Sequence, residues 1–269
     1  MLYIVATPIG NLEDITLRAL RVLKEADTIA AEDTRHTRKL LTHYDIKTRC
    51  VSFHEHSSEE KRAFILSELK EGRNIALVSD AGTPLISDPG AVLVREAVEM
   101  GLPVTSVPGP CAAVTAVTLS GIGGPFCFLG FFSKKAGERK KQIEQLKDLT
   151  MPAVIYESPH ALHETLSAML DLLGEQRHIV VAKELTKLHE RVFSGTIDQA
   201  VREFNGDIKG EYVLVVDAAE EELTDEISDG DIEKEIAKLL ASGMTKKDAA
   251  KAASEKFGIS KNRAYRLSL

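Results

Sequence analysis

The chain has 269 residues, of which 43% are hydrophobic and 28% charged, with 34 Lys and Arg against 41 Asp and Glu. These values are typical of a folded soluble protein and exclude disordered, collagen-like and fibrous chains. The length suggests two domains. No apolar run approaches the roughly 20 residues that cross a bilayer. Residues 2–6 predict a strand rather than a signal peptide, so we expect a cytoplasmic protein without a membrane partner.

Metal and common nucleotide signatures are missing from the sequence. Cys50, Cys111 and Cys127 have no CxxC spacing, which argues against a disulfide framework and a zinc site and favours small buried residues. The run at 54–56 (HEH) would point its two imidazoles to opposite sides, so we predict no metal site. The chain has no Gly-Lys dipeptide and no GxGxxG after a strand, which excludes a Walker A loop and an ordinary dinucleotide site.

Apolar segments alternate with helical patterns over the first 120 residues. Strands are predicted at residues 2–6, 28–31, 50–53, 74–79 and 103–107. Each strand is followed by a predicted helix. The first helix is capped by Asp14 or Thr16, the second lies in 31–41, and the third begins with a capping box at Ser57 and Glu60. The last two helices are predicted at 89–100 and 110–119. This alternation predicts a mostly parallel sheet with helices on both faces. The Gly/Pro cluster at 121–125 predicts a domain boundary.

A second α/β domain is predicted beyond that boundary. Its strands are expected at 126–132, 153–156, 178–183 and 212–216, and its helices at 137–149, 160–173 and 196–204. We therefore expect domains at residues 1–120 and 126–219, followed by a small module at 231–269.

The C-terminal module has a strong charge asymmetry. Residues 218–235 hold nine acids and one base, which is typical of a solvated linker, whereas 244–269 hold seven bases and two acids. Helices are predicted at 232–240, 246–257 and 261–267, with caps at Thr245 and Ser260 and a turn at 257–260. Three short helices, the last one basic, resemble a helix-turn-helix module. A small bundle that only packs on the enzyme explains the apolar spacing equally well.

A second basic run lies mid-chain. It contains Lys134, Lys135, Arg139, Lys140 and Lys141, interrupted by Glu138. Each run alone is consistent with a solvated helix face, but two of them on a chain of net charge −7 favour a polyanionic partner.

Four polar or glycine-rich loops follow predicted strands, at residues 7–14, 32–35, 79–90 and 107–113. Open α/β sheets bind ligands at the carboxyl ends of their strands, and small residues let the backbone approach a ligand closely. Any single loop is equally explained as a turn. Together the four loops predict a cofactor cleft.

The segments TPIGNLEDIT, AEDTRHTRKLL, SDAGTPLISDPG, VPGP and YESPH resemble the tetrapyrrole methylase superfamily of S-adenosylmethionine-dependent enzymes. The resemblance covers the whole chain, and it is greatest to the branch that 2'-O-methylates cytidine 1402 of 16S rRNA in the 30S subunit. Corrin and porphyrin methylases have Gly-Asp-Pro where this chain has Gly82-Thr83-Pro84, which argues against a tetrapyrrole substrate. The resemblance implies an α/β fold of class III methyltransferase type, with the cofactor between two domains, and a homodimer.

The resemblance also implies the site residues. In the first domain, S-adenosylmethionine would contact Pro8, Asp80, Ala81, Gly82, Leu85, Ile86, Cys111 and Ala112. In the second domain it would contact Tyr156, Glu157 and Leu185. Apolar walls suit adenine and the thioether, and Asp80 can accept hydrogen bonds from amino and ribose groups.

Methyl transfer from a sulfonium mainly requires alignment, but a ribose hydroxyl benefits from a general base or a cation. The candidates are Asp33, Glu157, Lys183 and Glu184, although 183–190 also fits a charged loop or helix start. Candidate RNA contacts are Arg35, Lys134, Lys135, Lys140, Lys187, Lys261, Arg263 and Arg266.

Two other functions remain open at this point. One is a methylase of a tetrapyrrole or another small molecule on the same scaffold, which would leave the basic C-terminal module unexplained. The other is a nucleic-acid-binding regulator that uses the C-terminal helices while its α/β part senses a ligand.

Overall fold

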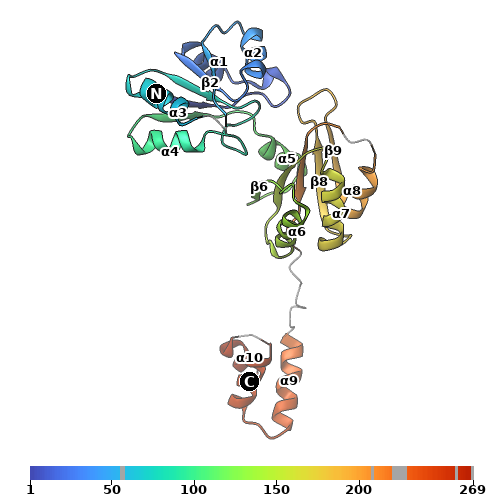
Figure 1. Cartoon of the computed structure of the whole chain (residues 1–269). Helices are drawn as coiled ribbons and strands as arrows, with labels where there is room; N and C mark the ends of the chain where they lie inside the picture. The colour runs from blue at the N-terminus through green and yellow to red at the C-terminus, as the bar shows by residue number, and fades with distance from the viewer. Residues whose placement is uncertain (55–57, 207–208, 220–228, 258–259, 268–269) are drawn as a thin grey trace. The chain divides into compact units, whose positions relative to one another are not determined.

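The computed structural model describes residues 1–54, 58–206, 209–219, 229–257 and 260–267. The chain divides into two compact units, Met1–Ala219 and Glu220–Leu269. The first unit contains two five-stranded sheets, which are visible in Figure 1. Among the described residues, no helix has the length and apolar character needed to cross a membrane.

The first sheet is entirely parallel, with the strand order β3-β2-β4-β1-β5. Its strands are β1 (Leu2–Val5), β2 (Thr28–Ala31), β3 (Cys50–Ser52), β4 (Ile75–Val78) and β5 (Val104–Val107). All five lie within the predicted segments, and the all-parallel arrangement agrees with the predicted sheet.

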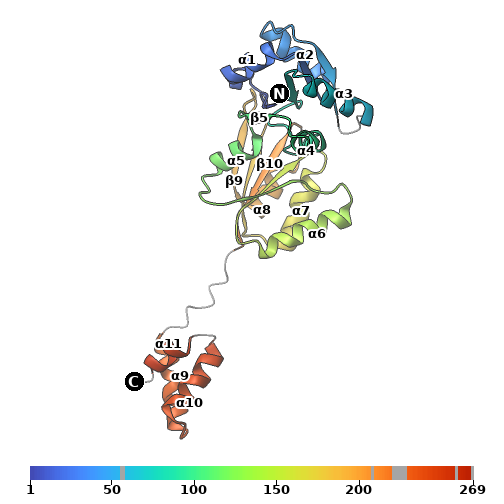
Figure 2. The same ribbon diagram turned by 90° about the vertical axis from the view of Figure 1, so that its left-hand side faces the viewer.

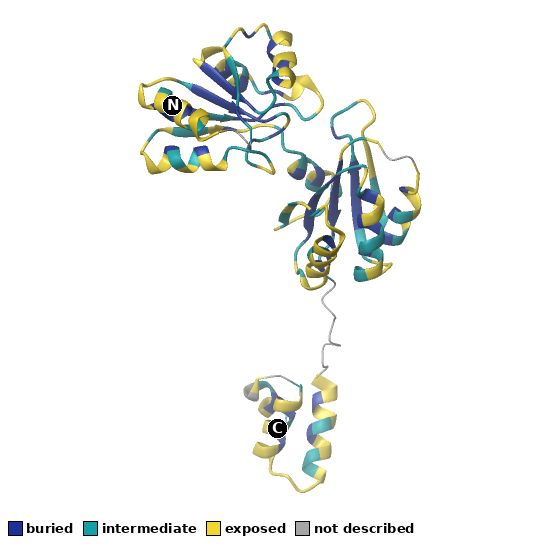
Figure 3. Ribbon diagram, viewed as in Figure 1, coloured by how far each residue is buried: buried dark blue, intermediate teal, exposed yellow. Residues whose placement is uncertain are grey.

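Helices cover both faces of this sheet. They are α1 (Leu17–Glu25), α2 (Thr34–His43), α3 (Glu59–Lys70) and α4 (Ala91–Glu99). Strand residues point alternately to the two faces: Ile29 and Ala31 of β2 pack with α1 and α2, whereas Ala30 packs with α3 and α4. Figure 3 shows the resulting pattern of buried strands between helices whose outer faces are exposed.

The helix caps are partly those expected. Thr16 caps α1, its hydroxyl accepting a hydrogen bond from the Ala19 amide at 3.0 Å, and a short 3₁₀ helix, η1 (Leu12–Asp14), precedes it. Ser58 caps α3 by accepting from the Lys61 amide. The predicted cap Ser57 lies outside the described residues.

The second sheet is mixed and has the order β6-β7-β10-β8-β9. Its strands are β6 (Cys127–Phe131), β7 (Ala153–Glu157), β8 (His178–Lys183), β9 (Arg191–Thr196) and β10 (Tyr212–Val216). Only the β6–β7 pair is parallel. One face packs against α6 (Ala136–Glu144), η2 (Gln145–Asp148), α7 (Leu162–Leu173) and α8 (Ile197–Glu203).

Helix α5 (Ala112–Ser120) packs against the opposite face of the second sheet. Its buried residues Ala113 and Ala116 share a core cluster with Val154, Val180 and Val215. A helix that directly follows β5 of the first sheet is therefore part of the core of the second. Figure 2 shows α5 beside β10, with which it is in contact. The two sheets are thus tied together by packing as well as by the chain.

Strand β9 was not predicted. Its sequence RVFSGT is largely exposed because β9 is an edge strand that pairs only with β8. Its apolar residue Phe193 packs edge-on against Phe204, the residue that ends α8. The cysteines also differ from expectation, since all three are half-buried free thiols.

The second unit contains three helices in its described part, α9 (Asp229–Ala241), α10 (Lys246–Phe257) and α11 (Lys261–Arg266). Their core consists of Ile232, Ile236, Ala249 and Ala253. The predicted caps are present: the Thr245 hydroxyl accepts from the Asp248 amide, and the Ser260 hydroxyl from the Arg263 amide. The predicted turn includes residues 258–259, and the predicted linker includes residues 220–228, both outside the described residues.

Candidate functional site

The four predicted loops meet at one edge of the first sheet. They follow β1, β2, β4 and β5, which are adjacent parallel strands, so their carboxyl ends lie together. Backbone bonds join Thr7 of the first loop to Gly82 of the third, at 2.9 and 3.0 Å. The Thr83 hydroxyl donates to the carbonyl of Pro110 in the fourth loop at 3.0 Å. The Asp33 amide donates to Asp80 Oδ1 at 3.0 Å, which adds the second loop.

A cavity of about 460 Å³ lies where these loops face the second sheet. Its wall from the first three loops consists of Ile9, Glu32, residues 80–83 and residues 86–88. Ala112 lines it at the start of α5, and the second sheet contributes Phe131, residues 156–159 and residues 211–213. The volume is within the range of small-ligand sites. Both sheets therefore contribute walls to one site, which we call the first cavity.

Seven of the eleven predicted cofactor residues line the first cavity: Asp80, Ala81, Gly82, Ile86, Ala112, Tyr156 and Glu157. The other four do not. Leu85 packs into the core between the first sheet and α3 and α4. Cys111 and Leu185 pack into the core beneath α5. Pro8 lies between the bridged Thr7 and the lining residue Ile9. These four side chains support the walls and do not line them.

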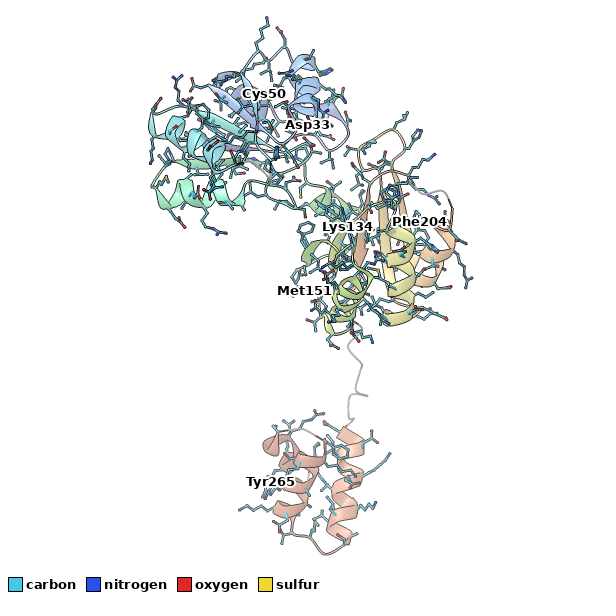
Figure 4. The ribbon with its side chains drawn as sticks, in the orientation of Figure 1. Asp33, Cys50, Lys134, Met151, Phe204 and Tyr265 are labelled. Carbon is cyan, nitrogen blue, oxygen red and sulfur yellow. The ribbon has the colours of Figure 1, made fainter. Side chains whose placement is uncertain are left out.

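Asp33, a predicted base, is a poor proton acceptor in this structure. Both its carboxylate oxygens accept hydrogen bonds from Arg35, at 2.8 and 3.2 Å, and these bonds lower the pKa of Asp33 to about 2. Asp33 is also the N-cap of α2. Its place at the start of α2 is labelled in Figure 4. It does not line the first cavity, and its amide positions Asp80.

Glu157, the second predicted base, lines the first cavity but is only 6% exposed. Its Oε1 accepts from the Ser158 amide at 2.8 Å, and its Oε2 accepts from the Thr165 hydroxyl at 2.6 Å. Because both oxygens are engaged, the carboxylate is placed to hold the loop after β7 against α7.

Lys183, the third predicted catalytic residue, lies at the end of β8 and does not line the first cavity. Its Nζ lies 5.8 Å from the centroid of the Tyr212 ring. The neighbouring Lys187 forms ion pairs with Glu184 at 2.8 Å and with Glu211 at 3.0 Å. These pairs fix the loop after β8, and the hydrogen bond from Lys187 keeps the pKa of Glu184 low.

The predicted RNA contacts are mostly exposed. Arg35 has an 87% exposed side chain beside Asp33, and Lys134, Lys135 and Lys140 are exposed at or before α6, with Lys134 labelled in Figure 4. Lys135 pairs with Glu138 at 3.1 Å. Arg139 of the same run is buried and pairs with Glu164, so the basic run is not one continuous exposed surface.

In the second unit, Arg266 is exposed and Arg263 pairs with Asp229 at 2.8 Å. The side chain of Lys261 lies outside the described residues. Exposed lysines on α10 were not among the predicted contacts; they are Lys246, Lys247 and Lys251.

Several cavity residues were missed by sequence reasoning, above all Asp88, Ser87 and Glu32. Burial raises the pKa of Asp88 to about 6, with the nearby carboxylates of Glu32 and Asp80 adding to the rise and the Ser79 hydroxyl opposing it. Asp88 and Ser87 belong to the glycine-rich loop at 79–90, so the sequence feature that could have identified them as cavity residues was the loop itself. Phe131 lies in an ordinary strand and gave none.

Among the described residues, no group of three His, Cys, Asp or Glu side chains is placed to hold a metal ion. Glu55 and His56 of the HEH run lie outside the described residues.

Solved structures with this architecture are methyltransferases and related enzymes. Uroporphyrin-III-C-methyltransferase from Thermus thermophilus aligns with a TM-score of 0.59 and 20% identity, covering 81% of this chain and 94% of that one. Diphthine synthase aligns with a TM-score of 0.60 and 15% identity, covering 81% and 89%. At these identities the likeness establishes the fold alone.

Sequence comparison gives the family. The model of the Tetrapyrrole (Corrin/Porphyrin) Methylases matches residues 1–201. Ribosomal RNA small subunit methyltransferase I of Haemophilus influenzae is 44% identical, covering 100% of this chain and 96% of that protein. The protein of the same name from Bacillus subtilis is 45% identical, covering 98% and 92%. The chain therefore belongs to the tetrapyrrole methylase family, and within it to the group of ribosomal RNA small subunit methyltransferase I proteins.

Proposed function

We propose that the protein is an S-adenosylmethionine-dependent methyltransferase that 2'-O-methylates the ribose of cytidine 1402 in 16S rRNA of the small ribosomal subunit. The observation that carries the proposal is the first cavity, which two sheets enclose at the carboxyl edge of the parallel one. Full-length similarity to ribosomal RNA small subunit methyltransferase I proteins supports the choice of substrate.

The lining of the first cavity suits S-adenosylmethionine. Ile9, Ala112 and Phe131 offer apolar surface to adenine and the thioether. Glu32 and Asp80 offer carboxylates to the positively charged ammonium and sulfonium groups. The backbone at Gly82 has φ +79, and an added Cβ would meet Ile9 Cγ2 at 3.3 Å, so a side chain here would crowd the wall of the cavity.

S-adenosylmethionine supplies an activated methyl group whose transfer to oxygen is a displacement in line with the breaking C–S bond. The protein's task is to hold donor and acceptor within near-attack distance and to exclude water. The bonds among Thr7, Gly82, Thr83 and Pro110 keep the loops rigid, so the walls are preorganised for this alignment.

Exposed bases of both units supply positive potential for the phosphates of RNA. Arg35, Lys134 and Lys140 lie on the first unit, and Lys246, Lys247 and Arg266 on the second. We also propose that the acceptor is the assembled 30S subunit, that the protein is a homodimer, and that it acts in the cytoplasm. Exposed apolar side chains on α5 and β6, including Val114, Leu119 and Leu129, are available for a subunit contact.

The test is to incubate the protein with labelled S-adenosylmethionine and, in parallel, with 30S subunits, naked 16S rRNA or a porphyrin precursor. We expect label in the RNA of the 30S reaction. The RNA linkage next to the methylated ribose should resist alkaline cleavage. Label in the porphyrin precursor would instead identify a small-molecule methylase. S-adenosylmethionine and RNA binding without transfer to any acceptor would identify a regulator.

A further inference from the structure

A second cavity of about 390 Å³ adjoins the first at the same edge of the sheet. The two cavities share Glu32, Ser87 and Asp88. The other walls of the second cavity are Phe53 and His54 after β3, Arg62 on α3, and residues 89–93 at the start of α4. A ligand in the second cavity would therefore lie next to a ligand in the first, with the Ser87–Asp88 segment between them.

The lining of the second cavity has two chemical characters. Carboxylates of Glu32 and Asp88 lie where it meets the first cavity. Elsewhere it has the guanidinium of Arg62, whose Nε donates to both oxygens of Glu96 at 3.1 and 2.9 Å and whose Nη2 lies 4.0 Å from Glu59; its five N–H groups include further donors. The first turn of α4 has no side-chain cap at Gly90, so its amides add donors to the same cavity. A nucleotide has matching groups, since its hydroxyls donate to carboxylates and its phosphate accepts from guanidinium and amide N–H groups.

The backbone around Asp88 is held in an unusual conformation. Leu85 and Ser87 have φ +73 and +65, in the left-handed region that non-glycine residues rarely adopt. Ser87 is also close to the second sheet, since a Cβ added to Gly130 of β6 would meet its Oγ at 3.0 Å. Packing from both sheets therefore keeps Asp88 at the junction of the two cavities.

We propose that the second cavity receives the acceptor nucleotide of the RNA and that Asp88 takes the proton of its 2'-hydroxyl. This inference rests on the proposed function. In the step, the hydroxyl oxygen forms a bond to the methyl carbon as the C–S bond breaks, and the bonding electrons return to sulfur. The O–H proton passes to the Asp88 carboxylate, which later releases it to water. The products are a methylated ribose and S-adenosylhomocysteine.

The ionisation of Asp88 agrees with this role. Its pKa of about 6 leaves the carboxylate mostly charged at neutral pH, yet close enough to the working pH to be an effective base. The titratable and charged groups around it are Glu32 and Asp80 on neighbouring loops, Tyr156 in the first cavity, and His54 and Arg62 in the second. The two carboxylates raise the pKa of Asp88, and burial is the larger cause.

The first experiment compares Asp88→Asn with Glu99→Gln, which removes an exposed acid from the other end of α4. We expect Asp88→Asn to lower kcat on 30S subunits about 10²- to 10⁴-fold, with S-adenosylmethionine affinity near that of the parent and a melting temperature no lower than that of the parent. The parent kcat should rise with pH through about 6, and this rise should vanish in Asp88→Asn but persist in Asp88→Glu. A folded Asp88→Asn protein that keeps parental kcat, or the same pH profile, overturns the inference.

The second experiment tests the cavity with Ala91→Phe, which places a ring in the second cavity only, because Ala91 does not line the first. The matched control is Val98→Phe, at an exposed position of the same helix. We expect Ala91→Phe to lower kcat/KM for 30S subunits at least about tenfold while calorimetry detects unchanged S-adenosylmethionine binding. Parental kcat/KM in Ala91→Phe overturns the cavity assignment. A parent protein that methylates no RNA overturns the proposed function itself, which separates the two failures.

Discussion

Thr7 and Gly82, 75 positions apart, form a reciprocal backbone pair: each amide donates to the other's carbonyl, at 2.9 and 3.0 Å. The pair joins the loop after β1 to the loop after β4, although strands β2, β3 and β4 lie between these loops in the sequence. The pair is an isolated antiparallel bridge beyond the ends of the parallel strands β1 and β4. Two backbone hydrogen bonds therefore anchor the wall of the first cavity at residues 80–83 to the loop after β1.

Replacing Gly82 by Val should abolish S-adenosylmethionine binding without unfolding the protein. The φ of +79 is strained for Val, and its side chain would crowd Ile9, which lines the cavity. Gly72→Val is the matched control, because Gly72 has φ +86 and no neighbour within 4 Å of an added Cβ. Calorimetry and thermal melting of both variants separate lost binding from backbone strain. Unchanged affinity in Gly82→Val would show that the third loop does not contact the cofactor.

Phe131→Ala should weaken S-adenosylmethionine binding about tenfold, because the ring is 55% exposed in the first cavity and its burial by a ligand contributes roughly 1–2 kcal/mol. The ring also packs edge-on against Tyr156, at 5.5 Å between centroids. Leu129→Ala on the same strand is the control, since Leu129 is 39% exposed and does not line the cavity. Equal S-adenosylmethionine affinities for the two variants in calorimetry would show that strand β6 does not contact the cofactor.

Glu157→Gln should act mainly on stability. The carboxylate is buried and its Oε2 accepts from the Thr165 hydroxyl at 2.6 Å, so weakening this pair costs about 1–3 kcal/mol. A double-mutant cycle with Thr165→Val, followed by urea unfolding, measures the coupling. We expect the pH profile of methyl transfer to keep its shape in Glu157→Gln. A folded variant whose kcat loses its pH dependence would restore Glu157 as the base.

Asp88→Asn should raise the melting temperature at pH 8. The folded-state pKa of about 6 lies above the ordinary value of 3.8, so the folded protein binds the proton more tightly than the unfolded chain does. The stabilising contribution of protonated Asp88 is complete below pH 3.8 and is lost as pH rises through 6. The advantage of the uncharged Asn should therefore be largest above pH 6 and shrink towards pH 4. Melting curves of both proteins across this range check the sign, and an advantage independent of pH would contradict it.

The sequence predicted strands best where apolar residues are continuous. Strands β8 and β10 begin and end at the expected residues because both lie inside the second sheet and are almost fully buried. Strand β9 was missed because an edge strand with an exposed Val192 lacks that apolar signature. The packing of α5 on the second sheet was also hidden, since periodicity marks which face of a helix is buried but not which sheet covers it.

The location of the candidate site could be predicted from the order of strands and loops in the sequence. Four loops after parallel strands had to share one edge, and seven of the eleven predicted cofactor residues line the first cavity. The role of Asp88 depends on burial and on two carboxylates distant in the sequence, Glu32 and Asp80. The sequence predicted Asp33 as a base and not Asp88, yet the bonds from Arg35 hold the pKa of Asp33 at about 2. Only three-dimensional contacts distinguish these two acids.

The C-terminal unit should contribute RNA affinity and leave cofactor binding unchanged. It is a separate compact unit with its own small core, and its exposed bases are available for phosphate contacts. Ending the chain after Asp229 should keep S-adenosylmethionine affinity, weaken 30S binding and flatten its salt dependence, because each lost phosphate contact lowers the logarithmic slope by about one.

Two sets of substitutions locate the contacting helix in the full-length protein. One set replaces Lys261, Arg263 and Arg266 by Ala, and the other replaces Lys246, Lys247 and Lys251 by Gln. Arg263 already pairs with Asp229, so its replacement also weakens the joining of α11 to α9. All three α10 lysines are exposed, and Lys246 and Lys247 lie at the helix start, so we expect their replacement to lower the salt slope with little change in melting temperature. If the unit only stabilises the enzyme, truncation should instead lower the melting temperature while 30S affinity at two salt concentrations stays at the parental values.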